Sequence, residues 1–80
     1  MTTEQMNAII AKIESIHKAT NEWLETYKKA KTEKAHMEIE YILKAYAFEQ
    51  NGIRFTLNIL GYDWDFNLDG SIYIHEKGVE

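Results

Sequence analysis

The stretch that decides the fold spans residues 65–76 and reads Asp-Phe-Asn-Leu-Asp-Gly-Ser-Ile-Tyr-Ile-His-Glu. Large apolar residues alternate with polar ones on both sides of Asp69-Gly70, which is typical of two strands joined by a turn. A three-residue loop at 68–70 places Phe66 opposite Ile72 and gathers the large side chains on one face of the sheet. A two-residue loop would mix the two faces. We therefore predict a β-hairpin with strands at about 62–67 and 71–76, and with Gly70 in the left-handed region.

The same twelve residues resemble the calcium-binding loop of EF-hand proteins, because they match its pattern of acidic, amide and glycine positions. The resemblance implies calcium ligands at six positions: Asp65, Asn67, Asp69, Ser71, Tyr73 and Glu76. An EF-hand loop also needs a helix on each side. The residues before Asp65 instead alternate with period two, and only four residues follow Glu76. The hairpin is our main expectation, and a calcium-binding protein is the alternative.

A further strand is expected directly upstream, at about 53–58, because Ile53, Phe55 and Leu57 alternate with polar residues. A loop at 59–62 would place Leu57 opposite Trp64 on the apolar face. Asn51-Gly52 would end the preceding helix, since glycine enters the left-handed region without penalty. The three strands would form an antiparallel meander.

Two helices are expected before the strands. Thr2 and Gln5 fit a capping box, and a helical period follows to about residue 29. Its apolar seam consists of Met6, Ile9, Ile13, Ile16, Trp23 and Tyr27. A second helix is expected at about 33–50, with Thr32 as its N-cap. It is apolar on two faces, one of them lined by Tyr41, Ala45 and Phe48, so it should contact the first helix and something else. One long helix that dimerises as a coiled coil is the alternative, because no proline or glycine precedes residue 52.

These elements predict a single α+β domain over residues 1–80. Its two layers would follow the order α-α-β-β-β, with an antiparallel helix pair packed on a three-stranded antiparallel meander. The apolar fraction of 45% and ten aromatic residues suffice for a core. The absence of cysteine excludes disulfides and thiolate metal sites.

The composition also limits the classes of partner. The net charge is −4, and most of it lies in the C-terminal part of the chain, which disfavours direct nucleic-acid binding. We see no signal peptide and no apolar run long enough to cross a membrane, so we expect a cytoplasmic protein with no membrane contact.

No motif in the chain specifies a chemistry. There is no G-x-S-x-G, no P-loop and no G-x-G-x-x-G sequence. His17, His36 and His75 share no metal-ligand spacing. We therefore expect that the protein is not an enzyme and has no cofactor, with calcium as the alternative described above.

Two surfaces are candidates for binding another protein. The first is an acidic face of the sheet with Tyr and His beside the carboxylates, a composition suited to a basic partner; its residues are Asp63, Asp65, Asn67, Asp69, Tyr73 and His75. The second is the seam of the first helix, for which we expect a homo-oligomer. The sequence thus indicates a non-enzymatic protein-binding module, of a size and composition met among phage or mobile-element regulators and inhibitors. An acidic decoy that mimics nucleic acid is a further alternative.

Overall fold

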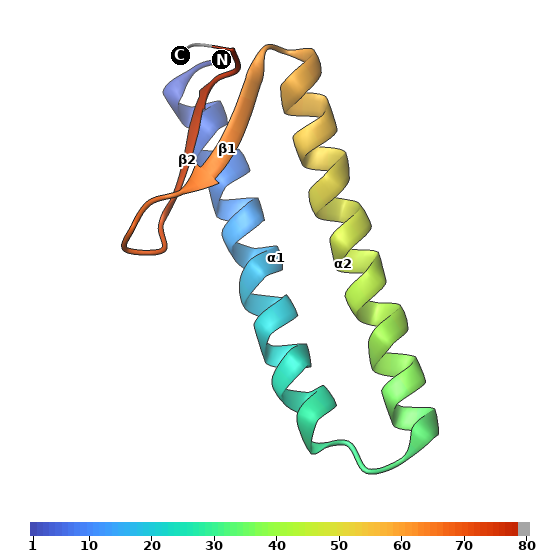
Figure 1. Cartoon of the computed structure of the whole chain (residues 1–80). Coiled ribbons are helices and arrows are strands. Elements are labelled where there is room, and N and C mark those ends of the chain that lie inside the picture. Colours follow the sequence, from blue (N-terminus) through green and yellow to red (C-terminus); the bar gives the residue numbers. More distant parts are fainter. Residues whose placement is uncertain (79–80) are drawn as a thin grey trace.

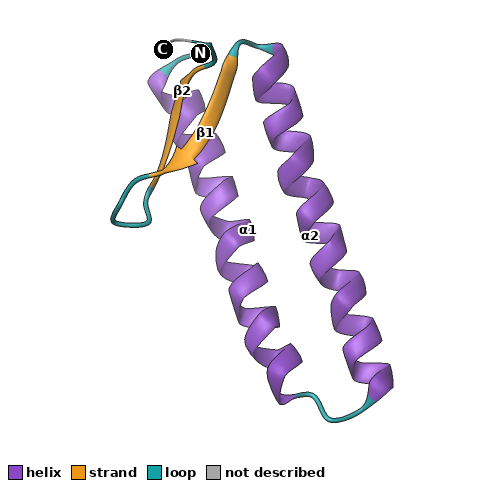
Figure 2. Cartoon of the chain, in the orientation of Figure 1, coloured by secondary structure: helices purple, strands orange, loops and turns teal. Residues whose placement is uncertain are grey.

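Two long antiparallel helices and a β-hairpin make up residues 1–78, the part of the chain that the computed structural model describes (Figures 1 and 2). The elements are α1 (Thr3–Lys29), α2 (Glu33–Ile59), β1 (Tyr62–Phe66) and β2 (Ile72–Glu76). The hairpin lies beside the end of the helix pair where α1 begins and α2 ends (Figure 1). β1 packs against α2, and β2 packs against α1.

Both helices begin at the N-caps that the sequence predicts. The Thr2 hydroxyl accepts a hydrogen bond from the Gln5 amide at 3.1 Å, and the Gln5 side chain accepts one from the Thr2 amide at 2.9 Å. The Thr32 hydroxyl accepts from the Ala35 amide at 3.1 Å. Each bond satisfies an amide that has no partner inside its helix. Because the chain turns at residues 30–32, the helices are separate and the alternative of one long helix is wrong.

The predicted three-stranded meander is wrong, because the segment at 53–58 is the last part of α2 and the sheet has two strands. Gly52 keeps a helical conformation, and α2 ends instead before Gly61, whose φ is 89°. The alternation that suggested a strand is ambiguous, since Ile53 and Leu57 share one face of a helix as well as one face of a strand. A strand would also have buried Phe55, whereas the helix leaves it 67% exposed.

The hairpin has the predicted register. Trp64 lies opposite Ile74 and Phe66 lies opposite Ile72. Gly70 has a φ of 87°, as expected for the left-handed position of the loop. The Asn67 amide donates to the Ser71 carbonyl at 2.7 Å and so closes the three-residue loop at 68–70.

The core lies where the hairpin meets both helices. Its buried residues are Ile13, Leu57, Trp64 and Ile72, with Ile9, Ile10, Ile53, Tyr62 and Ile74 packed around them. Farther along the helix pair, Ile16 and Ile39 are buried as well. Every element therefore contributes to one apolar cluster, and burial of these side chains is the main stabilising contribution to the fold.

Candidate functional site

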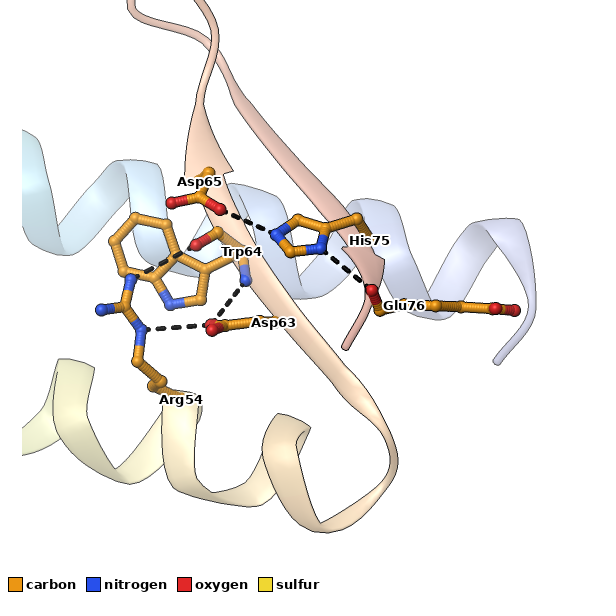
Figure 3. A network of polar contacts seen from close by, with 6 residues as sticks. All are labelled: Arg54, Asp63, Trp64, Asp65, His75 and Glu76. Carbon is orange, nitrogen blue, oxygen red and sulfur yellow. Dashed lines mark hydrogen bonds and ion pairs between the residues drawn. The ribbon is translucent and has the colours of Figure 1, made fainter. Parts of the chain in front are cut away.

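The outer face of the hairpin carries a network of polar contacts that spans both strands and reaches α2 (Figure 3). Asp63 lies 3.3 Å from the Arg54 guanidinium, and it also accepts a hydrogen bond from the Trp64 amide at 2.8 Å. Arg54 donates to the Trp64 carbonyl at 3.3 Å, and its guanidinium lies 4.3 Å from the centroid of the Trp64 ring. Arg54 therefore connects the C-terminal part of α2 to β1, and its ion pair with Asp63 is part of this connection.

His75 links the two strands on the same face. Its Nε2 lies 2.7 Å from Asp65 Oδ2, and its Nδ1 lies 3.2 Å from the carbonyl oxygen of Glu76. Both neighbours are hydrogen-bond acceptors, so both bonds form together only when each ring nitrogen carries a proton. Accordingly the pKa of His75 is raised, chiefly by the hydrogen bond to Asp65 and next by the bond to the Glu76 carbonyl. The pair is an exposed cross-strand ion pair.

The six residues predicted for the acidic face divide into two groups. Asp63, Asp65, Tyr73 and His75 lie together on the strands, and the rings of Tyr73 and His75 are 5.4 Å apart. The other two belong to the turn. The side-chain amide of Asn67 donates a hydrogen bond to the Ser71 hydroxyl at 2.8 Å. The Asp69 carboxylate accepts hydrogen bonds from the backbone amide and the hydroxyl of Ser71. These bonds from Ser71 lower the pKa of Asp69.

Residues 65–76 do not form an EF-hand loop. Asp65 lies opposite Tyr73, and Glu76 lies opposite Tyr62. The first and last proposed ligands are therefore separated by three strand positions, or about 10 Å along the hairpin. Among residues 1–78 no three acidic, histidine or cysteine side chains converge as a metal site would require. The sequence pattern is explained instead by the turn, which uses Asn67, Asp69, Gly70 and Ser71, and by the contact between Asp65 and His75.

The helical seam that we expected to mediate oligomerisation faces inward. Ile13 and Ile16 are buried, and the other four residues of the seam are half-buried, with Ile9 packed against the core. Tyr27, for example, contacts the ring of His36 and donates to Glu40 of α2 at 3.0 Å. In this structure the seam of α1 is used within one chain.

A different apolar surface is exposed, on the side of α2 that faces away from α1. We call it the outer stripe. Its seven members follow one another at helical steps of four and three residues: Met37, Tyr41, Ala45, Phe48, Gly52, Phe55 and Ile59. The exposed fractions of its five large side chains run from 63% for Met37 to 77% for Tyr41. None of the seven residues is charged or buried.

The sequence contained a signal for the outer stripe. Tyr41, Phe48 and Phe55 are seven residues apart and fall on one side of any continuous helix. The assumed helix stop at Gly52 cut this stripe in two and hid its length. Once α2 is continuous to Ile59, both of its faces are apolar, and only the inner one is covered.

The chain has no match to any protein-family model and no significant match among curated proteins or solved structures. Within residues 1–78, neither α1 nor α2 has the hydropathy that a membrane-crossing helix of its length requires.

Proposed function

We propose that the protein is a non-enzymatic protein-binding module and that the outer stripe of α2 is its contact surface. One observation carries this proposal: five large apolar side chains lie in water along one line of a helix. At about 200 Å² for each large side chain, their exposed fractions amount to roughly 700 Å² of apolar surface. The largest apolar patch of a typical monomer is about 300–600 Å², and larger patches usually mark interfaces.

The acidic face of the hairpin is a weaker candidate for the contact surface than the outer stripe. Asp63 pairs with Arg54, and Asp65 is hydrogen-bonded to His75, so two carboxylates of this face are already engaged by side chains of the same chain. This reduces the negative field that a basic partner or a nucleic-acid decoy would use. The Asp65–His75 pair also lies on an open strand face rather than in a cleft that could enclose a substrate, which favours a non-enzymatic role.

Site-specific photo-crosslinking in cells that produce the protein tests the contact surface. A benzophenone amino acid replaces Phe48, which is 74% exposed at the middle of the outer stripe. The matched control places it at Ser15, which is exposed on the opposite side of α1 from its seam. We expect irradiation to give a discrete protein adduct for Phe48 and none for Ser15, and we expect Phe55→Glu in the same chain to weaken the adduct.

The absence of an adduct at Phe48 would refute the proposal. So would the same set of adducts at both positions, because contact through the outer stripe requires that Ser15 remain in solvent.

A further inference from the structure

We propose that the outer stripe of α2 binds the outer stripe of a second copy of this chain, with the two helices antiparallel about a twofold axis. The inference rests on the proposed function, since it names the partner of the same surface. It follows from the order of large and small residues in the stripe, from the position of Gly52 and from the area available.

Large and small side chains alternate along the outer stripe. Tyr41, Phe48 and Phe55 are separated by Ala45 and Gly52, at steps of four and three residues. Two helices with this spacing can interlock side by side, provided that each large side chain meets a small one. The spacing itself is that of a coiled-coil seam.

Of the two directions available to an in-register twofold pair, the antiparallel one satisfies that condition at its central layers. When Phe48 of one copy lies opposite Gly52 of the other, Phe55 falls opposite Ala45 in the same register. Tyr41 then falls opposite Ile59, which closes the end of the contact with an aromatic and an aliphatic residue. Met37 lies beyond the end of the partner's α2 in this register. A parallel pairing in register would set Phe48 against Phe48 and Gly52 against Gly52, with crowded layers next to empty ones.

Gly52 supports this arrangement independently. Its φ is not in the left-handed region, and a Cβ atom built on it would meet no atom within 4 Å. The single chain therefore has no steric need for glycine at this point, although glycine is unfavourable inside a helix. An apolar groove of about 460 Å³ opens beside it, lined by Ile9, Lys12, Glu49, Gly52, Ile53, Thr56, Leu57 and Leu60. The Phe48 ring of a second copy can lie over Gly52 at the edge of this groove.

The area and the charges also fit a second copy. Without Met37, which lies beyond the partner's α2, the large side chains of the stripe offer roughly 580 Å² of apolar surface on each chain, at the small end of the about 600–1,000 Å² that each partner buries in a standard interface. A twofold contact buries positions 41–59 of both stripes at once and is closed, so it ends at a dimer. Near the axis the Glu49 residues of the two copies approach each other. Each is already paired with Lys12 of its own chain at 2.9 Å, which limits their repulsion.

Sedimentation equilibrium of the purified full chain at micromolar concentrations tests the dimer. We expect twice the mass of one 9.4 kDa chain. Phe48→Glu should give a monomer, whereas Ser15→Glu on the outside of α1 should leave the dimer intact. Gly52→Ala should weaken the dimer by about tenfold or more, because one added methyl group overpacks the closest layer. Gly52→Leu should abolish it. Circular dichroism of each variant verifies that the helices persist.

Single engineered cysteines test the direction, since the natural chain has none. In the antiparallel register Asn51 of each copy lies across from Asn51 of the other beside the axis, so Asn51→Cys should be joined by a short bis-maleimide. The two Ala45 residues are then ten residues apart along the helices, about 15 Å, so Ala45→Cys should not be joined. The opposite result would establish a parallel pair and overturn the proposed register.

A monomer at all concentrations, or a dimer that Phe48→Glu and Gly52→Leu leave unchanged, would also overturn the inference. Binding of the monomer to phosphatidylcholine vesicles would do the same, because it would assign the stripe to a lipid surface. A monomeric purified protein that still gives a heavier adduct from Phe48 in cells would leave the proposed function standing and refute the second copy as the partner. The absence of any adduct would refute the proposed function itself.

Discussion

The guanidinium of Arg54 lies 4.3 Å from the centroid of the Trp64 ring, and this contact joins the C-terminal part of α2 to β1. Arg54 also lies 3.3 Å from Asp63, the residue that precedes Trp64. One side chain thus makes a cation–π contact, an ion pair and a hydrogen bond at the joint between helix and hairpin.

Arg54→Ala should lower the free energy of unfolding by about 1 kcal/mol, because it removes the cation–π contact and leaves Asp63 without its cation. Arg54→Lys should recover part of this loss, since lysine keeps the charge but lacks the planar fork. Urea unfolding followed by tryptophan fluorescence measures both. Lys18→Ala, at an exposed position of α1, is the control, and an equal effect of the two alanine variants would contradict the role given to Arg54.

Gly70→Ala should destabilise the hairpin by about 1 kcal/mol or more, because a residue with a Cβ atom is strained at the φ of 87° that Gly70 adopts. No neighbouring atom lies within 4 Å of the position that the Cβ would take, so the cost is conformational rather than steric. Thermal unfolding measures the loss. Gly70→Asn should be less harmful than Gly70→Ala, since asparagine tolerates the left-handed region better.

Gly52→Ala should have the opposite effect on a single chain. Gly52 is inside α2 at a helical φ, so alanine should raise the free energy of unfolding by about 0.5–1 kcal/mol. The measurement is made in the Phe48→Glu background, where self-association is expected to be absent and only the helix contributes. Destabilisation in that background would show that the single chain does require glycine at this position.

The hairpin should become less stable as the pH rises through the folded-state pKa of His75. That pKa is raised, so the folded chain binds the proton more tightly than the unfolded chain does. The stabilisation is complete below the unfolded pKa of about 6.5 and is lost as the pH rises beyond the folded value. NMR titration of His75 and thermal unfolding at pH 5.5 and pH 8 measure the effect.

Asp65→Asn is the control for this pH dependence, because it removes the main cause of the raised pKa. It should return the pKa of His75 toward its ordinary range. It should also reduce the difference between the melting temperatures at pH 5.5 and pH 8. Asp63 and Tyr73, the other titratable groups on this face, remain in place. A His75 that titrates below its ordinary value in the natural chain would contradict the prediction.

Millimolar calcium should not stabilise the fold. Two of the three carboxylates of the EF-hand-like pattern already have partners, since Asp65 is hydrogen-bonded to His75 and Asp69 accepts hydrogen bonds from Ser71 in the turn. A ligand that binds only the folded state raises its melting temperature by mass action, so the melting temperature with calcium and with EDTA should agree within about two degrees. A saturable rise that Glu76→Gln abolishes would restore the calcium-binding alternative.

Much of this fold could be predicted because local chemistry determines it. Thr2 and Thr32 are good N-caps, and the alternation around Asp69-Gly70 admits one register that keeps the apolar residues on a single face. The end of α2 could not be predicted in this way. Glycine inside a helix costs about 1 kcal/mol, which burial of Ile53 and Leu57 against the core outweighs. That balance depends on tertiary contacts that no local pattern contains.

The candidate site was predicted only in part, for the same reason: the sequence indicated an apolar face at Tyr41, Ala45 and Phe48 but not its continuation beyond Gly52. The outer stripe crosses Gly52, so its continuity is visible only when the helix is known to continue to Ile59. The residues of the acidic face, in contrast, were grouped in part from the sequence, because Asp63, Asp65, Tyr73 and His75 follow the period of the strands. Their pairing with Arg54 and with each other required the three-dimensional structure.

The hairpin supports one end of the helix pair and leaves the other end to helix–helix packing alone (Figure 1). Tyr41 lies toward the unsupported end of α2, and Ile59 lies at the end beside the hairpin. In the antiparallel pair these two positions meet. The end of α2 that packs beside the hairpin in one copy then lies against the end of α2 that has no hairpin beside it in the other copy. Self-association would then do more than cover apolar surface: the two short hairpins would together stabilise both helices over residues 41–59.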